Sequence, residues 1–295
     1  MDLILIAKAV GALTVIGLVT AVILATAAKR FHVEVDPRVQ EVFDALPGSN
    51  CGACGNPSCF AVAEGIAVGD LEVTACVAGG QSCASAIATI MGADSCEMLT
   101  VVSARQCGGG TKAVRVYEYS GVTSCAAAHK LAGGPLGCMW GCIGLGDCMA
   151  ACPFDAIRMD ERGLPQIDQA KCTGCGICVR ECPRGEAGLL MLVPDEAPIV
   201  VRCNAHDRAK ERKANCPMCC IACKKCEREC PHDAIHVIDG NAVVDWEKCI
   251  GCLTCVEVCP QKCIDVHHVA GYDPLAVDGH GPAVLPQAAA ETVVS

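Results

Sequence analysis

The sequence predicts an α+β protein built of small, metal-stapled domains behind one N-terminal transmembrane helix. Three observations lead to this prediction. Cysteine supplies 28 of the 295 residues, and the chain holds only four Phe, three Tyr and two Trp. The third observation is an uncharged apolar run near the start of the chain. Aromatic side chains supply much of the packing energy of large cores, so a chain this poor in them needs disulfides or metal to hold its fold.

The apolar run covers residues 9–28, which is long enough to cross a bilayer as a helix of about 30 Å. Lys29 and Arg30 follow it directly, and basic residues stay on the cytoplasmic side. We therefore expect a single-pass anchor in the cell inner (cytoplasmic) membrane, with the rest of the chain in the cytoplasm. The alternative is a cleaved signal peptide with a site at residues 25–27, which Asp2 and the lack of a twin-arginine motif disfavour. In a reducing cytoplasm, grouped cysteines indicate metal rather than disulfides.

The first cysteine group follows a C-x2-C-x4-C-x16-C pattern and consists of Cys51, Cys54, Cys59 and Cys76. Three of these thiols lie within nine residues, and the Gly and Pro residues between them permit the sharp turns that wrap a [4Fe-4S] cluster. Four cysteines also suit zinc, but zinc sites usually show two separated C-x2-C pairs. We therefore expect an iron–sulfur cluster here.

The second group ends in the run C-x2-C-x2-C-x3-C-P, which is the pattern of bacterial ferredoxins. The fourth cysteine of such a run ligates the neighbouring cluster. Crossed ligation then predicts Cys138, Cys142, Cys148 and Cys182 for one cluster, and Cys152, Cys172, Cys175 and Cys178 for the other. The first half of the group is irregular because Leu145 stands where a regular run has cysteine, and we expect Cys138 to replace that ligand.

The third group repeats the second. The cysteine spacing of 13, 4, 6 and 4 residues that begins at Cys125 recurs from Cys203, and the Cys-Pro-Phe-Asp-Ala-Ile segment at Cys152 recurs as Cys-Pro-His-Asp-Ala-Ile at Cys230. The chain therefore contains a duplicated two-cluster module. The ligand runs of the second copy are Cys220, Cys223, Cys226 and Cys230, followed by Cys249, Cys252, Cys255 and Cys259. The expected cofactors are thus about five [4Fe-4S] clusters.

These motifs define the expected organisation of the chain. Short strand pairs at residues 156–167 and 235–244 pack on the helices that carry the cysteines. The predicted units are an anchor over 1–30, a 4Fe-4S cluster domain over 31–95, a linker region over 96–134, ferredoxin-like modules over 135–200 and 201–270, and a disordered tail over 271–295.

Eight cysteines remain outside the predicted ligand sets. They are Cys83, Cys96, Cys107, Cys125, Cys203, Cys216, Cys219 and Cys263. Their spacing is irregular, so we interpret them as buried free thiols. A sixth cluster is the alternative interpretation, and Cys216 is also an alternative ligand to Cys220 or Cys223.

The charge of the chain restricts its partners. The formal charge is −10, and cluster ligation makes it more negative because the ligating thiols are deprotonated. This acidity argues against a nucleic-acid partner. One basic stretch, residues 202–228, carries eight Lys and Arg against three Asp and Glu. We interpret this stretch as a solvated linker, with a docking surface for an acidic redox partner as the alternative.

The sequence contains no pattern typical of a catalytic or nucleotide-binding site. It has no P-loop, no dinucleotide-binding fingerprint and no catalytic-triad motif. We therefore expect no catalytic residues, and one-electron transfer by the clusters as the chemistry.

The order of an apolar anchor, then the Cys51–Cys76 cluster motif and then ferredoxin modules resembles that of the B subunits of Rnf electron-transport complexes. The resemblance covers nearly the whole chain up to about Cys263. The sequence departs from the family pattern at Asn56 and Ser58, where Tyr and Gly are usual, and in having two modules where shorter members have one.

The resemblance implies a membrane complex that moves electrons between reduced ferredoxin and NAD, coupled to Na⁺ or H⁺ translocation. Its partners would be the other subunits of the complex and soluble ferredoxin as electron donor. The chain would act as part of a translocase without a substrate site of its own, because flavins and the NAD site would lie on other subunits. The alternatives are an electron-transfer subunit of another membrane oxidoreductase, such as a hydrogenase or reductase, and a structural metal-binding protein.

Overall fold

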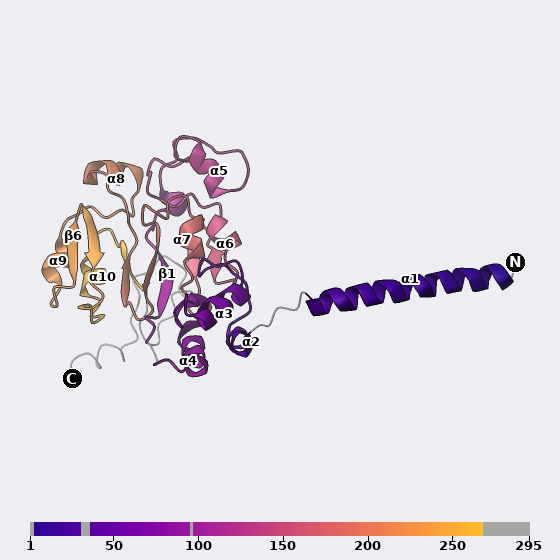
Figure 1. The fold of residues 1–295 in the computed structure, drawn as a ribbon. Coiled ribbons are helices and arrows are strands. Elements are labelled where there is room, and N and C mark those ends of the chain that lie inside the picture. The colour runs from indigo at the N-terminus through magenta and orange to yellow at the C-terminus, as the bar shows by residue number, and fades with distance from the viewer. Residues whose placement is uncertain (1–2, 31–35, 95–96, 268–295) are drawn as a thin grey trace.

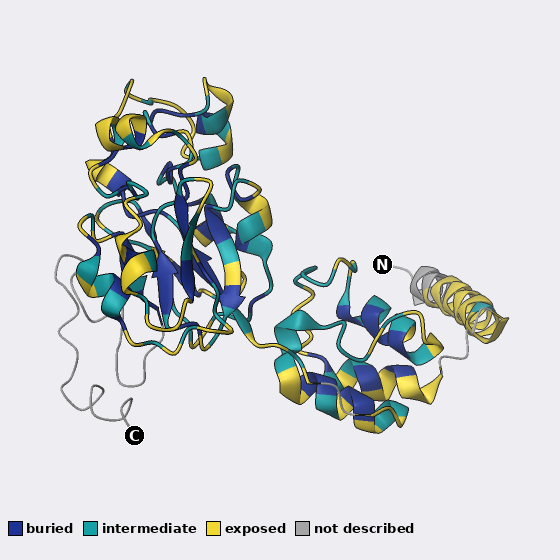
Figure 2. Cartoon of the chain, turned by 90° about the vertical axis from the view of Figure 1, so that its left-hand side faces the viewer, coloured by how far each residue is buried: buried dark blue, intermediate teal, exposed yellow. Residues whose placement is uncertain are grey.

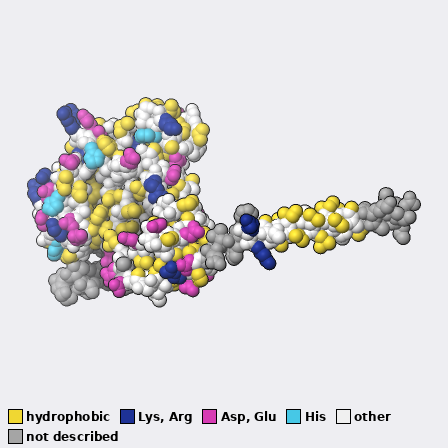
Figure 3. Space-filling view, in the orientation of Figure 1, with side chains coloured by type: hydrophobic (Ala, Val, Ile, Leu, Met, Phe, Trp, Pro, Cys, Tyr) yellow, Lys and Arg dark blue, Asp and Glu magenta, His cyan; other side chains and the backbone are white. Residues whose placement is uncertain are grey.

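The computed structural model describes residues 3–30, 36–94 and 97–267, so the predicted tail and Cys96 lie outside the described residues. Helix α1 (Leu3–Arg30) projects away from the other domains (Figure 1). Its apolar part, Val10–Arg30, is unburied, and Figure 3 shows hydrophobic side chains along it with Lys and Arg at the end nearer the other domains. By length and composition α1 can cross a membrane, a test that a signal sequence near an N-terminus also passes.

A small helical domain follows α1 (Figure 2). Its elements are α2 (Pro37–Ala45), α3 (Cys59–Val68), the 3-10 turn η1 (Val77–Gly79) and α4 (Gly80–Met91). The Ser58 side chain caps α3 by accepting a hydrogen bond from the Ala61 N–H, and Gly69 ends the helix in the left-handed conformation. The three α-helices enclose a core that includes the fully buried Val42 and Ile87.

The first ferredoxin-like module contains two antiparallel strand pairs and two short helices. β1 (Val101–Arg105) pairs with β4 (Leu190–Pro194), and β2 (Ile157–Met159) pairs with β3 (Pro165–Ile167). The helices are α6 (Asp147–Ala150) and α7 (Ile177–Glu181). The β2–β3 hairpin is the one that the sequence predicts.

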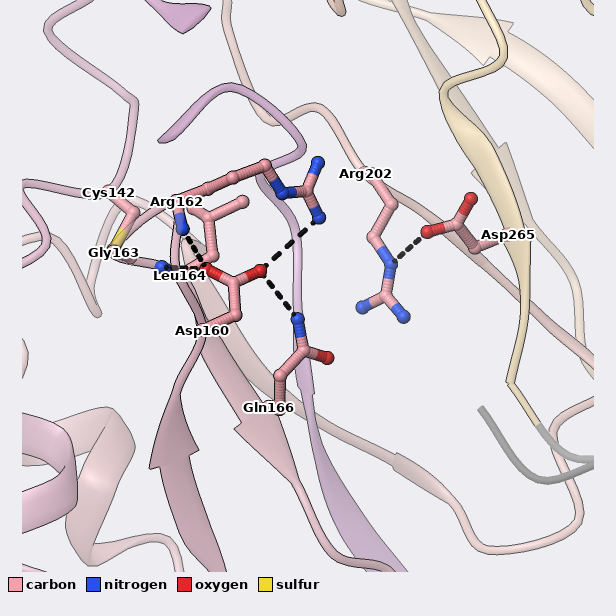
Figure 4. Close-up of polar contacts among 8 residues, drawn as sticks. All are labelled: Cys142, Asp160, Arg162, Gly163, Leu164, Gln166, Arg202 and Asp265. Atoms are coloured by element: carbon pink, nitrogen blue, oxygen red, sulfur yellow. Dashed lines mark hydrogen bonds and ion pairs between the residues drawn. The ribbon is translucent and has the colours of Figure 1, made fainter. Parts of the chain in front are cut away.

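The Asp160 side chain fixes the turn of that hairpin. It accepts hydrogen bonds from the Arg162 N–H at 2.9 Å, the Leu164 N–H at 2.8 Å and the Gln166 side-chain amide at 2.9 Å (Figure 4). These contacts satisfy backbone N–H groups that the short turn leaves without strand partners.

The second module repeats this arrangement. β5 (Ile199–Val201) pairs with β8 (Ile264–Val266), and β6 (Ile235–Ile238) pairs with β7 (Asn241–Val244). The helices α9 (Lys225–Glu229) and α10 (Thr254–Val258) take the places of α6 and α7. The described part also contains η2 (Gly110–Lys112), α5 (Cys125–Lys130) and α8 (Ala209–Asn215) in the loops of the two modules.

The module boundaries differ from the sequence expectation. Residues 101–105 were expected in a linker region, yet they form β1 and pair with β4 of the first module. Residues 199 and 200 fell at the end of the first predicted module, yet they belong to β5, which pairs with 264–266 at the end of the second. Each module is thus closed by a strand pair whose partners lie far apart in the sequence, and hydrophobic periodicity does not reveal such partners.

The two modules contact each other through backbone and side-chain hydrogen bonds. Gly108 N–H donates to the Arg202 carbonyl at 2.9 Å, and the Arg202 guanidinium donates to the Arg105 carbonyl at 2.8 Å. The same guanidinium pairs with Asp265 on β8 at 3.0 Å (Figure 4). Arg202 therefore links β1 of the first module to β8 of the second.

Removal of residues 1–30 tests whether α1 contributes to this fold. Because α1 is unburied over Val10–Arg30, the truncated chain should dissolve without detergent and retain the thermal unfolding midpoint of the full-length chain in detergent. Circular dichroism melting under anaerobic conditions measures both. Aggregation of the truncated chain, or a midpoint lower by more than about 5 °C, would mean that α1 packs on the helical domain.

Candidate metal centres

The first cysteine set lines one cavity of the helical domain. Its four cysteines are Cys51, Cys54, Cys59 and Cys76, which are joined there by apolar residues such as Leu46 and Val62. Gly52 lies between the first two thiols and Gly55 directly after the second, and both adopt positive φ, which turns the chain around the cavity. The Asn50 side chain accepts a hydrogen bond from the Cys59 N–H at 2.8 Å, which ties the start of α3 to the same loop.

The second cavity contains one cysteine that the sequence did not assign to it. Its thiols are those of Cys125, Cys142, Cys148 and Cys182, with Ile143, Leu189 and Leu190 among the apolar lining. Cys138 was expected in this set, but it is not among the lining residues, and Cys125 takes the position instead. Cys125 was expected to be a buried free thiol.

Asp147 explains why Cys125 reaches the second cavity. Its carboxylate accepts hydrogen bonds from the Cys125 N–H at 2.8 Å, the Ala126 N–H at 2.9 Å and the Ser124 hydroxyl at 3.0 Å. These bonds hold the first turn of α5, on which Cys125 lies, against α6, which begins at Asp147.

The third set gathers beside Ser103 in the middle of β1. Burial, together with the neighbouring thiols Cys172, Cys175 and Cys152, raises the pKa of Cys178. The Ser103 N–H donates a hydrogen bond to Cys172 Sγ at 3.4 Å, and the Ser103 hydroxyl lies 3.3 Å from Cys178 Sγ. The four thiols of the predicted set therefore lie together.

The fourth and fifth sets lie in the second module. One cavity is lined by Cys220, Cys223, Cys226 and Cys259, and by Cys263 as well. The other is lined by Cys230, Cys249, Cys252 and Cys255. The last cysteine of each run therefore lies with the first three cysteines of the other run, which is the crossed arrangement that the motif predicts.

Two further cysteines contact thiols of these sets. Cys263 Sγ lies 3.7 Å from Cys259 Sγ, and its hydrogen bonds lower the pKa of Cys259 to about 6 and that of Cys220 to about 5. In the first domain, a hydrogen bond from Cys83 lowers the pKa of Cys76 to about 6. Cys83 and Cys263 are both buried, and they provide S–H donors beside the candidate ligand sulfurs.

Burial of the cysteine thiols raises their pKa and thereby limits what these cavities can hold. It raises the pKa of Cys148 and Cys255 to about 12 and that of Cys226 to about 11. A thiolate persists in such surroundings when a metal replaces its proton. Within the described ranges, no group of three or more His, Cys, Asp or Glu side chains is arranged to hold a single metal ion. Four thiols around one cavity are the donor set that holds a cubane of four iron and four sulfide ions.

Comparison with protein families gives the same cofactor. A putative Fe-S cluster family matches residues 46–78, a 4Fe-4S dicluster domain matches residues 140–186, and a 4Fe-4S binding domain matches residues 242–265. These matches fall on the first cavity and on both ferredoxin-like modules.

Curated relatives match most of the chain. The B subunit of the Na(+)-translocating ferredoxin:NAD(+) oxidoreductase complex of Acetobacterium woodii is 44% identical over 256 residues, which are 86% of this chain and 76% of the relative. The B subunit of the ion-translocating oxidoreductase complex of Methanosarcina acetivorans is 39% identical over 260 residues, covering 88% and 97% of the two chains. The B subunit of the proton-translocating ferredoxin:NAD(+) oxidoreductase complex of Clostridium ljungdahlii is 39% identical, with coverages of 85% and 89%.

Replacing Cys182 tests the crossed arrangement. The Cys182→Ala variant should lose about four iron atoms per chain and expose Cys125, Cys142 and Cys148 to an alkylating reagent, because Cys182 shares their cavity. Mass-spectrometric mapping of alkylated cysteines under anaerobic, native conditions measures this. Cys152→Ala is the matched control and should expose Cys172, Cys175 and Cys178 instead. Labelling of those three thiols in the Cys182→Ala variant would contradict crossing.

Proposed function

Because the chain belongs to the family of B subunits of ion-translocating oxidoreductase (Rnf) complexes, we propose that its five cysteine sets hold five [4Fe-4S] clusters and that it relays electrons from soluble ferredoxin to its partner subunits. It is an iron–sulfur electron-transfer subunit of an ion-translocating ferredoxin:NAD oxidoreductase complex. When bound, such clusters accept and release single electrons. The convergence of five sets of four cysteines carries the proposal.

The packing within each module supports electron passage over short distances. Cys148 of the second set and Cys178 of the third belong to one buried cluster of side chains, against which Cys152 and Cys182 pack. In the second module, Cys226 of the fourth set and Cys255 of the fifth share one buried cluster in the same way. Apolar residues around these thiols exclude water and keep the sites of each module adjacent.

The distance between anchor and first domain supports a membrane-proximal position for the first cavity. Only residues 31–36 separate Arg30 from Pro37, so the two can be at most about 25 Å apart. With α1 in the membrane and its basic end in the cytoplasm, the helical domain would lie at the cytoplasmic surface. The ferredoxin-like modules would extend further into the cytoplasm, where soluble ferredoxin reaches them first.

This arrangement assigns roles to the partners. Ferredoxin donates electrons at the modules, and the first domain faces membrane-bound subunits. The chain acts within a translocase that couples electron transfer to movement of Na⁺ or H⁺, and the flavins and NAD site lie on other subunits. The chain itself binds no substrate other than its electron donor and acceptor.

Metal analysis tests the cofactor assignment. The full-length chain, reconstituted anaerobically with iron and sulfide, should contain at least about twenty iron and twenty acid-labile sulfide per chain, from five complete sets. Elemental analysis of iron and zinc, with a colorimetric sulfide assay, measures this. Bound zinc, or fewer than about twelve iron per chain, would overturn the proposal.

Replacing Cys54 tests the direction of electron entry. In a complex that carries Cys54→Ala, reduced ferredoxin should still bleach the visible absorbance of the modules, while ferredoxin-dependent NAD reduction stops, because Cys54 lines only the first cavity. Anaerobic stopped-flow spectroscopy and an NADH assay separate the two events. Modules that stay oxidised in the Cys54→Ala complex would place the entry at the first domain instead.

A further inference from the structure

The cavity of the fourth set contains one more thiol than a cubane needs. Its crossed set consists of Cys220, Cys223, Cys226 and Cys259, and Cys263 lines the same cavity. A [4Fe-4S] cluster takes four cysteine ligands, so one of the five thiols remains free of iron. The internal repeat and the geometry of the turn identify Cys263 as this fifth thiol.

The internal repeat shows which residue normally stands at position 263. The segment Cys-Pro-His-Asp-Ala-Ile at 230–235 corresponds to Cys-Pro-Gln-Lys-Cys-Ile at 259–264, so Cys263 takes the place of Ala234. The segment Cys-Pro-Phe-Asp-Ala-Ile at 152–157 also has alanine at this position. The cysteine before proline belongs to a ligand set in each segment, whereas the position four residues later is occupied by cysteine only once.

The structure confirms that positions 234 and 263 are equivalent. Lys262, directly before Cys263, adopts a φ of 45°, and Asp233, directly before Ala234, adopts a φ of 51°. Cys263 and Ala234 are both 2% exposed. Ala234 lines the cavity of the fifth set, as Cys263 lines that of the fourth. The two cavities therefore differ at this position by one S–H group.

Strand pairing holds the backbone at Cys263. The Cys263 carbonyl accepts a hydrogen bond from the Arg202 N–H at 2.6 Å, directly beside the β5–β8 pair. From this position Cys263 Sγ lies 3.7 Å from Cys259 Sγ. A hydrogen bond from Cys263 also lowers the pKa of Cys220 to about 5. The S–H group thus contacts two of the four candidate ligands of its cavity.

Ligation decides which of these sulfurs donates. A cysteine sulfur that binds iron has lost its proton, so Cys259 and Cys220 can only accept hydrogen bonds when they are ligands. Cys263 keeps its proton, because burial and two neighbouring negatively charged sulfurs disfavour a further thiolate. At the fifth set, the equivalent contact comes from the backbone alone, where the Ala234 N–H donates to Cys230 Sγ at 3.4 Å.

We propose that the Cys263 S–H group donates hydrogen bonds to ligand sulfurs of the fourth set and raises the reduction potential of the cluster held there. This inference rests on the proposed function. Reduction adds one negative charge to a cluster, and hydrogen bonds to its sulfurs are among the features that set its potential, because they stabilise the added charge. Cys263 therefore shifts an electron shared between the two sites of the second module toward the fourth.

Replacing Cys263 tests the donor directly. In Cys263→Ala, the ratio of reduced to oxidised fourth cluster at a fixed potential should fall about tenfold, which is a downward shift of about 59 mV for a one-electron couple. The iron content should equal that of the wild type. Redox titration of the anaerobically reconstituted full-length chain, followed by electron paramagnetic resonance, measures the shift. Cys263→Ser keeps a hydroxyl donor and should retain a potential closer to that of the wild type.

The reverse substitution at the equivalent position gives an independent test. Ala234→Cys places an S–H group beside the fifth set, so it should raise the potential of one cluster, and that cluster should differ from the one that Cys263→Ala affects. Val266→Ala is the matched control for a structural role. It removes buried side-chain volume from the same strand, β8, without lining the cavity, so it should leave every potential unchanged.

The outcomes separate this inference from the proposed function. Loss of about four iron atoms in Cys263→Ala would make Cys263 a ligand and overturn its role as a donor. Unchanged potentials in both Cys263→Ala and Ala234→Cys, or an equal shift in Val266→Ala, would also overturn that role and leave the proposed function standing. A wild-type chain with zinc or fewer than about twelve iron would instead overturn the proposed function, and this inference with it.

Discussion

Metal–thiolate bonding at buried cysteines is the interaction on which the rest of the structure depends. The modules have short strands, short helices and few aromatic side chains, so apolar burial alone gives each of them little stability. Their buried clusters of side chains are built around cysteines, among them Cys148 and Cys178 in the first module and Cys226 and Cys255 in the second. A thiol in such a core is either a small apolar group or a metal ligand, and grouping by four in cavities favours the ligand.

Metal–thiolate bonding in the interior also affects which charged side chains are buried. A chain of clusters carries negative charge in its interior, and that charge must be balanced without access to water. Arg105, Arg184 and Arg212 are buried with N–H groups left unpartnered, and no buried carboxylate accompanies them among the described residues. The arginines and the clusters are therefore two halves of one electrostatic arrangement. Loss of a cluster would leave a buried positive charge as well as an empty cavity.

Much of the site could be predicted from the sequence because ferredoxin ligation depends on local spacing. The regular run from Cys220 to Cys230 and its partner run place their thiols as expected, and the β2–β3 hairpin lies where strand patterning predicts it. The first copy is different because Leu145 interrupts its run. There a side chain on a separate helix completes the set, and the three hydrogen bonds of Asp147 that hold this helix leave no signal in cysteine spacing.

Long-range strand pairing is the other feature that the sequence did not predict. β1 lies in a segment expected to be a linker, and nothing in its five residues identifies β4 as its partner. The pairing matters for the site because it brings Ser103 to the third set and Cys107 to the contact between modules.

The dependence of the fold on metal–thiolate bonds can be measured directly by unfolding the chain with and without iron. Full-length protein in detergent is melted under anaerobic conditions before and after removal of iron by a chelator, and circular dichroism follows the transition. We expect the iron-loaded chain to unfold in a cooperative transition. In the iron-free chain this transition should be absent from every part except α1, because the modules lack a core that is stable without their ligand bonds. An iron-free chain that melts cooperatively at the same temperature would contradict it.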